Sequence, residues 1–219
     1  MYKTVVFDLD GTLLNTLTDL ADAGNRLCRK YGWPTHERQA YRYFVGNGIP
    51  KLVERLAPAD QRTPAVLEAA LADFKRDYGQ HLRDTTAPYP GIPEMLAKLK
   101  ANGVQLAVFS NKADALAKEV VKDYFGTQYF TIVRGQMTGV APKPAAEGTN
   151  ALLQALHADP ASTLYVGDSN VDIQTAKNGG LTSCGVLWGF RGRAELEAEG
   201  ADCLARTPEE LVKAVLGDG

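Results

Sequence analysis

The stretch Asp8-Leu9-Asp10-Gly11-Thr12 decides the fold, and it directly follows the apolar run Val5-Val6-Phe7. The apolar run predicts a buried strand that ends at Phe7. If the chain stays extended beyond this point, both aspartates share one face, because side chains alternate along a strand. Paired carboxylates can bind a divalent cation, or act as nucleophile and proton carrier. An Asp-Gly pair is also typical of a hairpin turn, but residues 13–20 look more like the entrance to a helix.

Short β-branched or aromatic runs alternate with helical stretches along most of the chain. We expect strands at residues 4–7, 105–109, 131–133, 163–166 and 184–188, and helices at 91–102, 113–124, 147–156 and 172–178. This alternation predicts an α/β fold with a doubly wound, parallel, Rossmann-like sheet and helices on both faces.

One long segment breaks the alternation, because residues 16–82 show helical periodicity and no convincing strand. Apolar residues recur there in three stripes: Leu17, Leu20, Ala21, Gly24, Leu27 and Cys28; Ile49, Leu52, Val53 and Leu56; Val66, Leu67, Ala70, Leu71 and Phe74. We therefore expect an all-helical cap, residues 16–85, inserted after the first strand of an α/β core formed by residues 1–15 and 86–219. Hinges are expected near residues 14–16 and 85–90.

Polar residues gather where the predicted strands end. Asp8 and Asp10 follow the first strand, Ser110-Asn111-Lys112 the second, Lys143 the third and Asp168 to Asp172 the fourth. Each has a structural explanation by itself, such as a helix cap. However, ligands of open parallel sheets bind beyond the carboxyl ends of the strands. The occurrence of polar residues at four strand ends of one chain favours a single functional site.

These segments, in this order, resemble the four motifs of the haloacid dehalogenase superfamily: Asp-x-Asp-Gly-Thr, a strand-end Ser, a Pro-flanked Lys and Gly-Asp-Ser-x-x-Asp. The resemblance extends over nearly the whole chain and includes the helical cap. Within the superfamily it is closest to phosphoglycolate-phosphatase-like proteins. The segments that carry this closer likeness are Val45-Gly46-Asn47-Gly48, Tyr89-Pro90-Gly91, Ser110-Asn111-Lys112, Trp188-Gly189-Phe190-Arg191 and Gly200-Ala201-Asp202.

The resemblance implies a Mg²⁺-dependent phosphatase for small phosphate monoesters, with 2-phosphoglycolate as the favoured substrate. Asp8 would be the nucleophile that forms an aspartyl phosphate, and Asp10 would carry the proton as general acid and base. Ser110, Asn111 and Lys143 would bind the phosphate.

The resemblance also implies the residues that hold Mg²⁺. Asp8, the Asp10 main-chain carbonyl and Asp168 would be ligands. Asp172, four residues after Asp168 on the same predicted helical face, would ligate through water or orient the site.

Several positions depart from the motifs of the superfamily, among them Ala145 and Ala146 in place of the usual Asp-Pro. The lysine motif is commonly Lys-Pro-x-Pro, whereas Ala141 stands here at the position of that lysine and Lys143 lies two residues later. We expect Lys143 to fill the role through a shifted loop. Asn15 stands where many members of the superfamily carry an acid, close to the expected hinge.

Substrate selection is expected to depend on the cap, because the core motifs contact only the phosphoryl group. Gly46-Asn47-Gly48 is a loop that lets backbone approach a ligand closely. If residues 49–56 are helical, the N–H groups at the start of that helix favour a carboxylate. Asn47 and Lys51 are therefore the candidate selecting residues, although a solvated surface lysine is the alternative explanation for Lys51.

Three other functions remain open. A β-phosphoglucomutase-like isomerase uses the same aspartate pair but returns the phosphoryl group to a sugar. An inorganic pyrophosphatase or nucleotidase of the same superfamily is a rival hydrolase. A non-catalytic binding module is disfavoured, because unused buried carboxylates would only destabilise the fold.

Composition limits the partners. The 219 residues include 24 basic and 26 acidic side chains, so the net charge is −2 and no basic stripe predicts nucleic-acid binding. No apolar run approaches the roughly 18 residues of a membrane span. Cys28, Cys184 and Cys203 are scattered, which is typical of buried thiols in a reducing compartment. We therefore expect a cytoplasmic monomer or homodimer that acts on a small phosphorylated metabolite.

Overall fold

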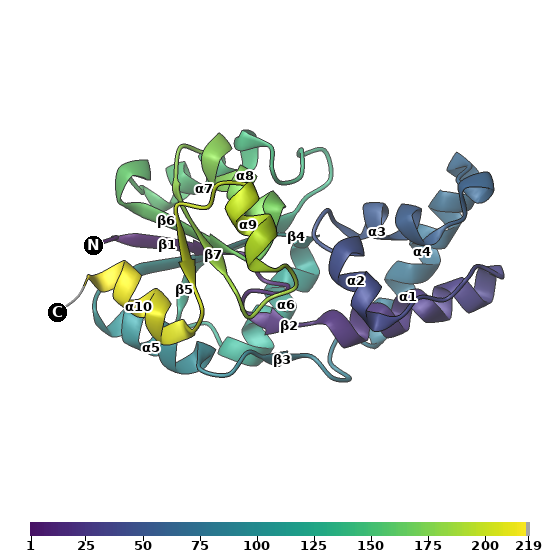
Figure 1. The fold of residues 1–219 in the computed structure, drawn as a ribbon, viewed down its shortest axis with the longest axis horizontal. Helices are drawn as coiled ribbons and strands as arrows, with labels where there is room; N and C mark the ends of the chain where they lie inside the picture. Colours follow the sequence, from purple (N-terminus) through teal and green to yellow (C-terminus); the bar gives the residue numbers. More distant parts are fainter. Residues whose placement is uncertain (218–219) are drawn as a thin grey trace.

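Six parallel strands form the central sheet of the computed structural model, which describes residues 1–217 (Figure 1). The spatial order is β5-β4-β1-β6-β7-β8. The strands are β1 (Thr4–Phe7), β4 (Gln105–Ala113), β5 (Phe130–Gln136), β6 (Thr163–Gly167), β7 (Thr182–Val186) and β8 (Cys203–Ala205). The order reverses at β1, whose two neighbours are β4 and β6. This reversal is the point where open α/β sheets bind ligands, and the predicted Rossmann-like α/β class is confirmed.

Helices cover both faces of the sheet, which explains why its strands are apolar on both sides. Val5 and Phe7 of β1 belong to the apolar cluster that includes side chains of α5, α6 and α10. Val6 points to the other face, where it packs with side chains of α7 and α8. The core helices are α5 (Ile92–Ala101), α6 (Asp114–Phe125), α7 (Ala146–Leu156), α8 (Asn170–Asn178), α9 (Arg193–Ala198) and α10 (Pro208–Leu216).

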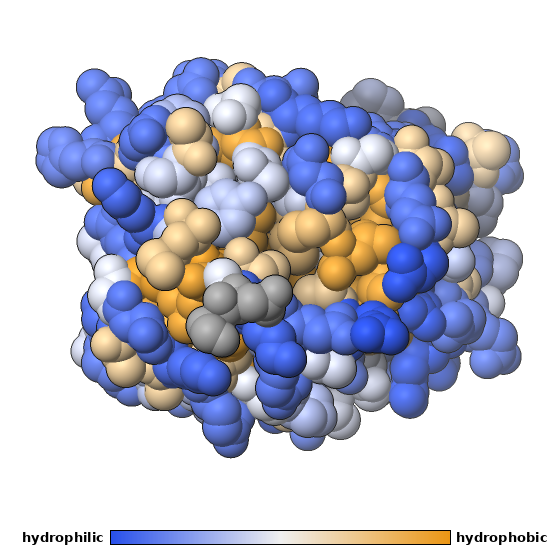
Figure 2. Space-filling model, turned by 60° about the vertical axis from the view of Figure 1, so that its left-hand side comes forward, coloured by the Kyte–Doolittle hydropathy of each residue, from blue (hydrophilic) through white to orange (hydrophobic). Residues whose placement is uncertain are grey.

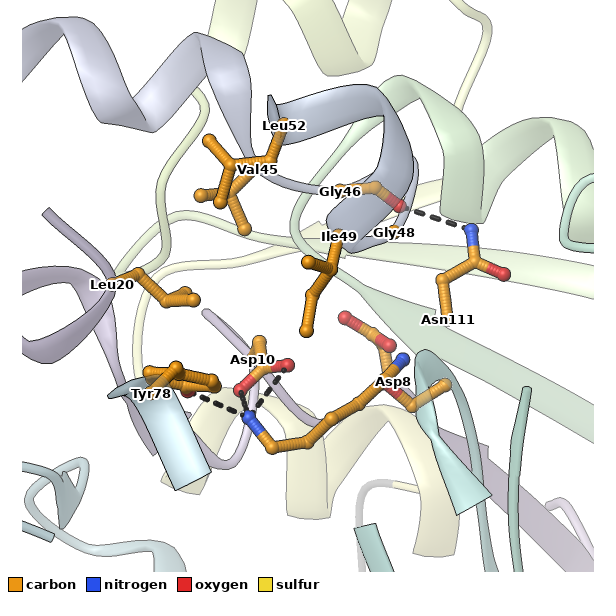
Figure 3. Close-up of a pocket in the computed structure, with 12 residues that line it drawn as sticks. Asp8, Asp10, Leu20, Val45, Gly46, Gly48, Ile49, Leu52, Tyr78 and Asn111 are labelled. Atoms are coloured by element: carbon orange, nitrogen blue, oxygen red, sulfur yellow. Dashed lines mark hydrogen bonds and ion pairs between the residues drawn. The ribbon is translucent and has the colours of Figure 1, made fainter. Parts of the chain in front are cut away.

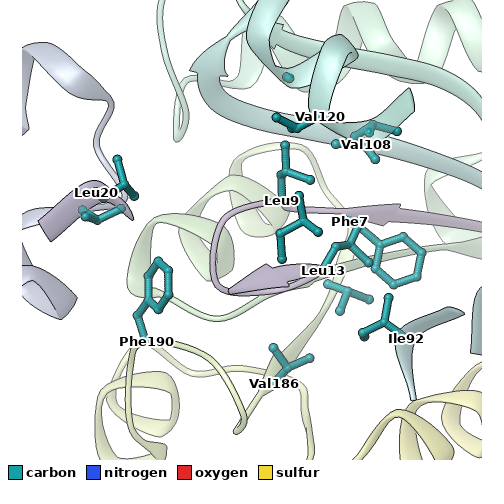
Figure 4. Packing of buried hydrophobic residues seen from close by; sticks show 14 of the residues in the cluster. Phe7, Leu9, Leu13, Leu20, Ile92, Val108, Val120, Val186 and Phe190 are labelled. Carbon is teal, nitrogen blue, oxygen red and sulfur yellow. The ribbon is translucent and has the colours of Figure 1, made fainter. Parts of the chain in front are cut away.

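Buried leucines anchor the loop that carries the two aspartates. Leu9 and Leu13 are fully buried in the same cluster as Phe7 and Val108 (Figure 4). Burying one leucine side chain contributes roughly 1.5–3 kcal/mol. Because Leu9 is held in the core, the carboxylates on either side of it point the other way, toward the cap.

Four α-helices form the cap, which lies to the right of the sheet in Figure 1. They are α1 (Leu17–Tyr31), α2 (Arg38–Phe44), α3 (Ile49–Leu56) and α4 (Pro64–Gln80), with the short 3₁₀ helix η1 (Ala59–Gln61) before α4. Most residues of the first two predicted apolar stripes are buried. In the third stripe, Ala70 and Phe74 are buried. Helix α2 was not predicted, and it approaches α1 closely at Gly24, where a Cβ atom would lie 2.5 Å from the Tyr41 ring.

The connections between core and cap contain a second, two-stranded sheet. β2 (Leu14–Asn15) pairs antiparallel with β3 (Ala87–Pro88). The interpretation of the chain from residue 13 as a helix entrance is therefore wrong up to Asn15, because a partner strand about 70 residues away sets the local conformation. Buried Asp19 ties the same junction together, since its carboxylate accepts bonds from the main-chain N–H and the hydroxyl of both Thr85 and Thr86. The division of the chain at residues 15/16 and 85/86 stays a prediction.

Other boundaries differ from the expectations. β4 continues through Ala113, with an irregular register between Phe109 and Ala113, so Ser110-Asn111-Lys112 lies within an extended segment of this strand. β7 begins and ends two residues earlier than expected. β8, α9 and α10 were not predicted. Cys28 and Cys184 are buried and Cys203 is half-buried.

The amino-terminal side of the core faces away from the cap. Figure 2 turns this side toward the viewer and shows apolar patches interrupted by hydrophilic side chains. No helix in the described part of the chain is long and apolar enough to cross a membrane.

Candidate active site

A narrow cavity of about 40 Å³ lies between the carboxyl ends of β1 and β4 and the cap (Figure 3). At the ~15 Å³ that one water molecule needs, it has room for only two or three. Its lining comprises Asp8, Asp10, Leu20, Val45, Gly46, Gly48, Ile49, Leu52, Tyr78, Ser110, Asn111 and Lys112. Apolar side chains of the cap therefore face the two carboxylates across a space that admits little water.

The Lys143 ammonium joins two of the predicted acids. Its Nζ lies 2.8 Å from Asp8 Oδ1 and 2.8 Å from Asp172 Oδ1, and it donates a third bond to the Tyr165 hydroxyl. Only 2% of the Lys143 side chain is exposed. A buried charge needs such partners to be stable. That Lys143 takes the role of the motif lysine through a shifted loop stays a prediction.

Asp168 is held by the loops around it. Its Oδ1 accepts a bond from the Thr12 hydroxyl and its Oδ2 accepts one from the Phe190 main-chain N–H. A Cβ atom on Gly11 would lie 2.4 Å from Asp168 Oδ2, and one on Gly189 would lie 2.3 Å from its Cβ. Gly11 also has φ +94°, which favours glycine. Because neither glycine has a Cβ atom, the Asp168 side chain can pack against their backbone without a clash.

Asp172 has a capping role beside its contact with Lys143. Its Oδ2 accepts bonds from the main-chain N–H and the hydroxyl of Ser169, which precedes the first residue of α8. Helix α8 begins at Asn170, so the interpretation that Asp168 and Asp172 share a helical face is wrong. The capping turn at Ser169 brings the two acids together instead.

Ser110 and Asn111 lie next to the acids. The Ser110 hydroxyl accepts a bond from the Lys112 main-chain N–H, and Ser110 lines the cavity. The Asn111 amide group donates to the Gly46 carbonyl of the cap and to the Lys143 carbonyl, and its oxygen accepts from the Lys143 N–H. Asn111 therefore braces the lysine loop and the cap loop at the same time.

Sequence reasoning gave no role to Lys112 and Tyr78. The Lys112 Nζ lies 3.1 Å from Asp10 Oδ1 and 2.9 Å from the hydroxyl of Tyr78, which belongs to α4. The buried stripe of α4 offered a signal, because Tyr78 continues the spacing of Ala70 and Phe74. That spacing indicates burial, but it does not reveal the partner.

The two cap residues that we expect to select the substrate lie outside this cavity. Asn47 and Lys51 instead line a separate hollow of about 560 Å³ between the cap and the loops around Gln136 and Pro142. Asn47 Oδ1 accepts a bond from Arg55, and Lys51 forms an ion pair with Glu54 on the same helix. Their role in substrate selection stays a prediction.

Burial changes the ionisation of the acids. It raises the pKa of the Asp8 carboxyl to about 7, because desolvation and the nearby Asp172 outweigh the charge of Lys143. Burial also raises the pKa of Asp168 well above its usual range, and the charges of Asp172 and Asp8 raise it further. Burial lowers the pKa of Lys143, but the charges of Asp172 and Asp8 more than offset this, so the pKa lies well above its usual value.

The acids fit a divalent cation. Asp8, Asp168 and Asp172 each offer a carboxylate oxygen, these atoms all lie within 4.8 Å of one another, and all three residues are buried. Mg²⁺ prefers oxygen ligands. Three carboxylates meet here, whereas Lys143 supplies one ammonium to Asp8 and Asp172, so negative charge remains in the cluster. The donor set and its excess charge therefore suit a divalent cation.

Comparisons with known proteins agree with this geometry. Residues 5–186 match the family of haloacid dehalogenase-like hydrolases. A phosphoglycolate phosphatase of Neisseria meningitidis is 35% identical over 191 residues, which is 86% of this chain and 81% of that protein. A phosphoglycolate phosphatase of Aquifex aeolicus is 30% identical over 96% of this chain and 95% of its own length. The crystal structure of a proposed phosphoglycolate phosphatase from Lactobacillus delbrueckii subsp. bulgaricus has a TM-score of 0.93 and 31% identity, covering 99% of both chains.

We predict that the metal-free protein loses stability as the pH rises from about 4 to about 7. The pKa of Asp8 is raised on folding, so the folded state holds its proton more tightly and this contribution disappears as the pH passes the folded value of about 7. The slope for one such group approaches about 1.4 kcal/mol per pH unit. Urea unfolding in chelator at several pH values measures it. The Asp8→Asn variant should have a shallower profile, and a profile parallel to that of the wild type would contradict the assignment.

We also predict that Mg²⁺ at about 20 times its dissociation constant raises the melting temperature of the wild type by about 5 °C. The shift should vanish in Asp168→Ala, which lacks one of the three clustered carboxylates. Exposed Asp159 provides a matched control, because Asp159→Ala removes an acid remote from the cluster and should retain the shift. Equal shifts of the melting temperature in both variants would show that Asp168 does not bind the metal.

Proposed function

The chain belongs to the haloacid dehalogenase-like hydrolases, and within this family we propose that it is a Mg²⁺-dependent phosphatase with 2-phosphoglycolate as its substrate. Phosphoric monoester hydrolysis is the activity of the phosphoglycolate phosphatases that it resembles along most of its length. The observation that carries the proposal is the arrangement of Asp8 and Asp10. Both line one cavity at the end of β1, and Lys143 holds the first of them.

In the first step, an Asp8 carboxylate oxygen attacks phosphorus while the bond from phosphorus to the leaving oxygen breaks. Lys143 binds Asp8 Oδ1, which orients the other carboxylate oxygen for attack. Asp10 gives its proton to the leaving alcohol, since a poor leaving group needs protonation as it departs. The products of this step are the free alcohol and an aspartyl phosphate on Asp8.

In the second step, water attacks the phosphorus of the aspartyl phosphate. Asp10, now ionised, accepts the proton of the attacking water, and the bond between phosphorus and Asp8 breaks to release inorganic phosphate. The Ser110 hydroxyl and the Lys143 ammonium stabilise the phosphoryl oxygens in both steps. The second step requires one water molecule, and the narrow cavity beneath the cap excludes most other water.

Asp8, the Asp10 main-chain carbonyl and Asp168 would hold Mg²⁺, with Asp172 acting through water. When bound, the cation would neutralise charge on the transferring phosphoryl group. Lys143 already contacts Asp8 and Asp172, so an ammonium and a bound cation would together neutralise the acids.

The lining of the cavity supports a small leaving group. Apolar side chains of the cap, Leu20, Ile49 and Leu52, border the same narrow space as Asp8 and Asp10. The relatives named phosphoglycolate phosphatase support glycolate as that leaving group. We further propose that the protein acts in the cytoplasm as a monomer or homodimer, without a nucleic-acid or membrane partner, in keeping with its net charge of −2.

A panel of phosphorylated metabolites assayed with Mg²⁺ tests the proposal. We expect kcat/KM for 2-phosphoglycolate to exceed the values for sugar phosphates, pyrophosphate and nucleotides. Conversion of a sugar 1-phosphate to its 6-phosphate isomer would identify an isomerase instead. A preference for pyrophosphate or a nucleotide would show that the protein is a hydrolase with a different substrate.

We predict that Asp8→Asn reduces turnover to background, because the amide retains the volume of the side chain but not the attacking carboxylate. Phosphate release measures turnover, and circular dichroism checks that the variant folds. Exposed Asp159→Asn serves as the matched control and should keep wild-type turnover. Substantial activity in folded Asp8→Asn would exclude Asp8 as the nucleophile.

We also predict that Asn47→Ala and Lys51→Ala raise the KM for 2-phosphoglycolate severalfold and leave 4-nitrophenyl phosphate turnover nearly unchanged. Asn47 accepts a bond from Arg55, and both Asn47 and Lys51 line the hollow beside Gly48 of the cap loop, which also borders the cavity. Steady-state kinetics on both substrates measure the effect. Equal losses on both substrates would indicate a role in folding or cap closure, and no loss on either would place selection elsewhere in the cap.

A further inference from the structure

We propose that Lys112 is a positioning residue that holds Asp10 for proton transfer when the cap is closed, through its bond to the Tyr78 hydroxyl. The inference rests on the proposed phosphatase reaction and deepens it. It assigns a task to a buried lysine and a buried tyrosine that the four sequence motifs do not explain.

The contacts of Lys112 form a bridge between the core and the cap. Its Nζ lies 3.1 Å and 3.4 Å from the two Asp10 carboxylate oxygens and 2.9 Å from the Tyr78 hydroxyl. The ammonium also lies 4.9 Å from the centroid of the Tyr78 ring. Figure 3 shows Tyr78 and Asp10 next to each other beneath the cap side chains Ile49 and Leu52.

Burial makes this bridge energetically demanding. Only 2% of the Lys112 side chain is exposed, and 14% of the Asp10 side chain. A buried ammonium must be paired and hydrogen-bonded, because removing one partner of a buried ion pair is strongly destabilising. The ammonium therefore requires both Asp10 and Tyr78, and its position fixes the Asp10 carboxylate.

The backbone determines where the lysine can reach. Lys112 lies in the irregular segment of β4, and its N–H donates to the Ser110 hydroxyl. Its main chain is thereby fixed to the phosphate side of the cavity. The side chain spans from this point toward α4, so Tyr78 meets the ammonium only when α4 lies over the core.

The consequence concerns the timing of proton transfer. Asp10 must lie within hydrogen-bond reach of the leaving oxygen when the bond to phosphorus breaks. A protonated carboxyl still accepts hydrogen bonds through its remaining lone pairs, so the fixed ammonium orients Asp10 both before and after it has given up its proton. A free Asp10 side chain would sample several rotamers. Because the cap supplies Tyr78, Asp10 reaches this orientation after the cap has closed and excluded water.

The test compares two aryl phosphates of similar shape in the full-length protein with Mg²⁺. Phenyl phosphate has a poor leaving group that needs the proton of Asp10, whereas 4-nitrophenyl phosphate has a good leaving group that does not. The parameter kcat/KM reports the first phosphoryl transfer alone. We expect Lys112→Met to reduce kcat/KM for phenyl phosphate about 100-fold, as loss of general acid catalysis does, and to change the value for 4-nitrophenyl phosphate by less than about threefold.

Tyr78→Phe keeps the ring and removes only the hydroxyl, so it tests the link to the cap even if Lys112→Met folds poorly. We expect about a tenfold loss on phenyl phosphate, the usual cost of one hydrogen bond to a charged group, with the same small effect on 4-nitrophenyl phosphate. Tyr41→Phe is the matched control. Tyr41 is another buried cap tyrosine, its hydroxyl donates to Asn25, and its loss should change neither value.

Equal losses on both phosphates would overturn the proposal, because they indicate damage to the fold or to phosphate binding. Unchanged kinetics in Tyr78→Phe would also overturn it. The double variant should lose no more than Lys112→Met alone, since Tyr78 acts through the lysine, and additive losses would contradict that link. Aryl phosphates do not depend on the natural substrate, so a failure of 2-phosphoglycolate as substrate would leave this test intact.

Discussion

The ammonium of Lys143, 2.8 Å from both Asp8 and Asp172, is the interaction on which the site depends. Four segments must meet for this contact to form: the end of β1, the loop before α7, β6 through Tyr165, and the first turn of α8. Without the ammonium, the negative charges of Asp8, Asp168 and Asp172 would face one another in a buried space. Their repulsion would oppose folding, so the lysine allows the acids to approach closely enough to hold a cation.

The cap and the metal-binding acids share a common support. Arg42 of α2 donates to the carbonyls of Gly189 and Phe190, while Arg191 of the core donates to the Val45 carbonyl of the cap. The Phe190 N–H in turn donates to Asp168. One short core loop, residues 189–191, therefore contacts both the cap and Asp168 through hydrogen bonds.

Lys143 and Lys112 hold different aspartates at the end of β1. Lys143 contacts acids of the core, and its main chain is linked to the cap through Asn111, which also donates to the Gly46 carbonyl. Lys112 contacts Asp10 and the cap residue Tyr78, so its position depends on closure. In the reaction that we propose, core residues would hold the nucleophile Asp8, and a contact from the cap would help to hold the proton carrier Asp10.

The sequence by itself determined the sheet class, the acids at the strand ends and the helical nature of the cap, because apolar periodicity and turn chemistry act over a few residues. The tertiary structure decided which strands pair and which side chains contact one another. The pairing of β2 with β3 and the contact of Lys112 with Tyr78 join segments whose local patterns do not encode one another. A buried ammonium or an unpaired strand takes whichever partner the packed chain brings within hydrogen-bond distance, and only the three-dimensional fold specifies that partner.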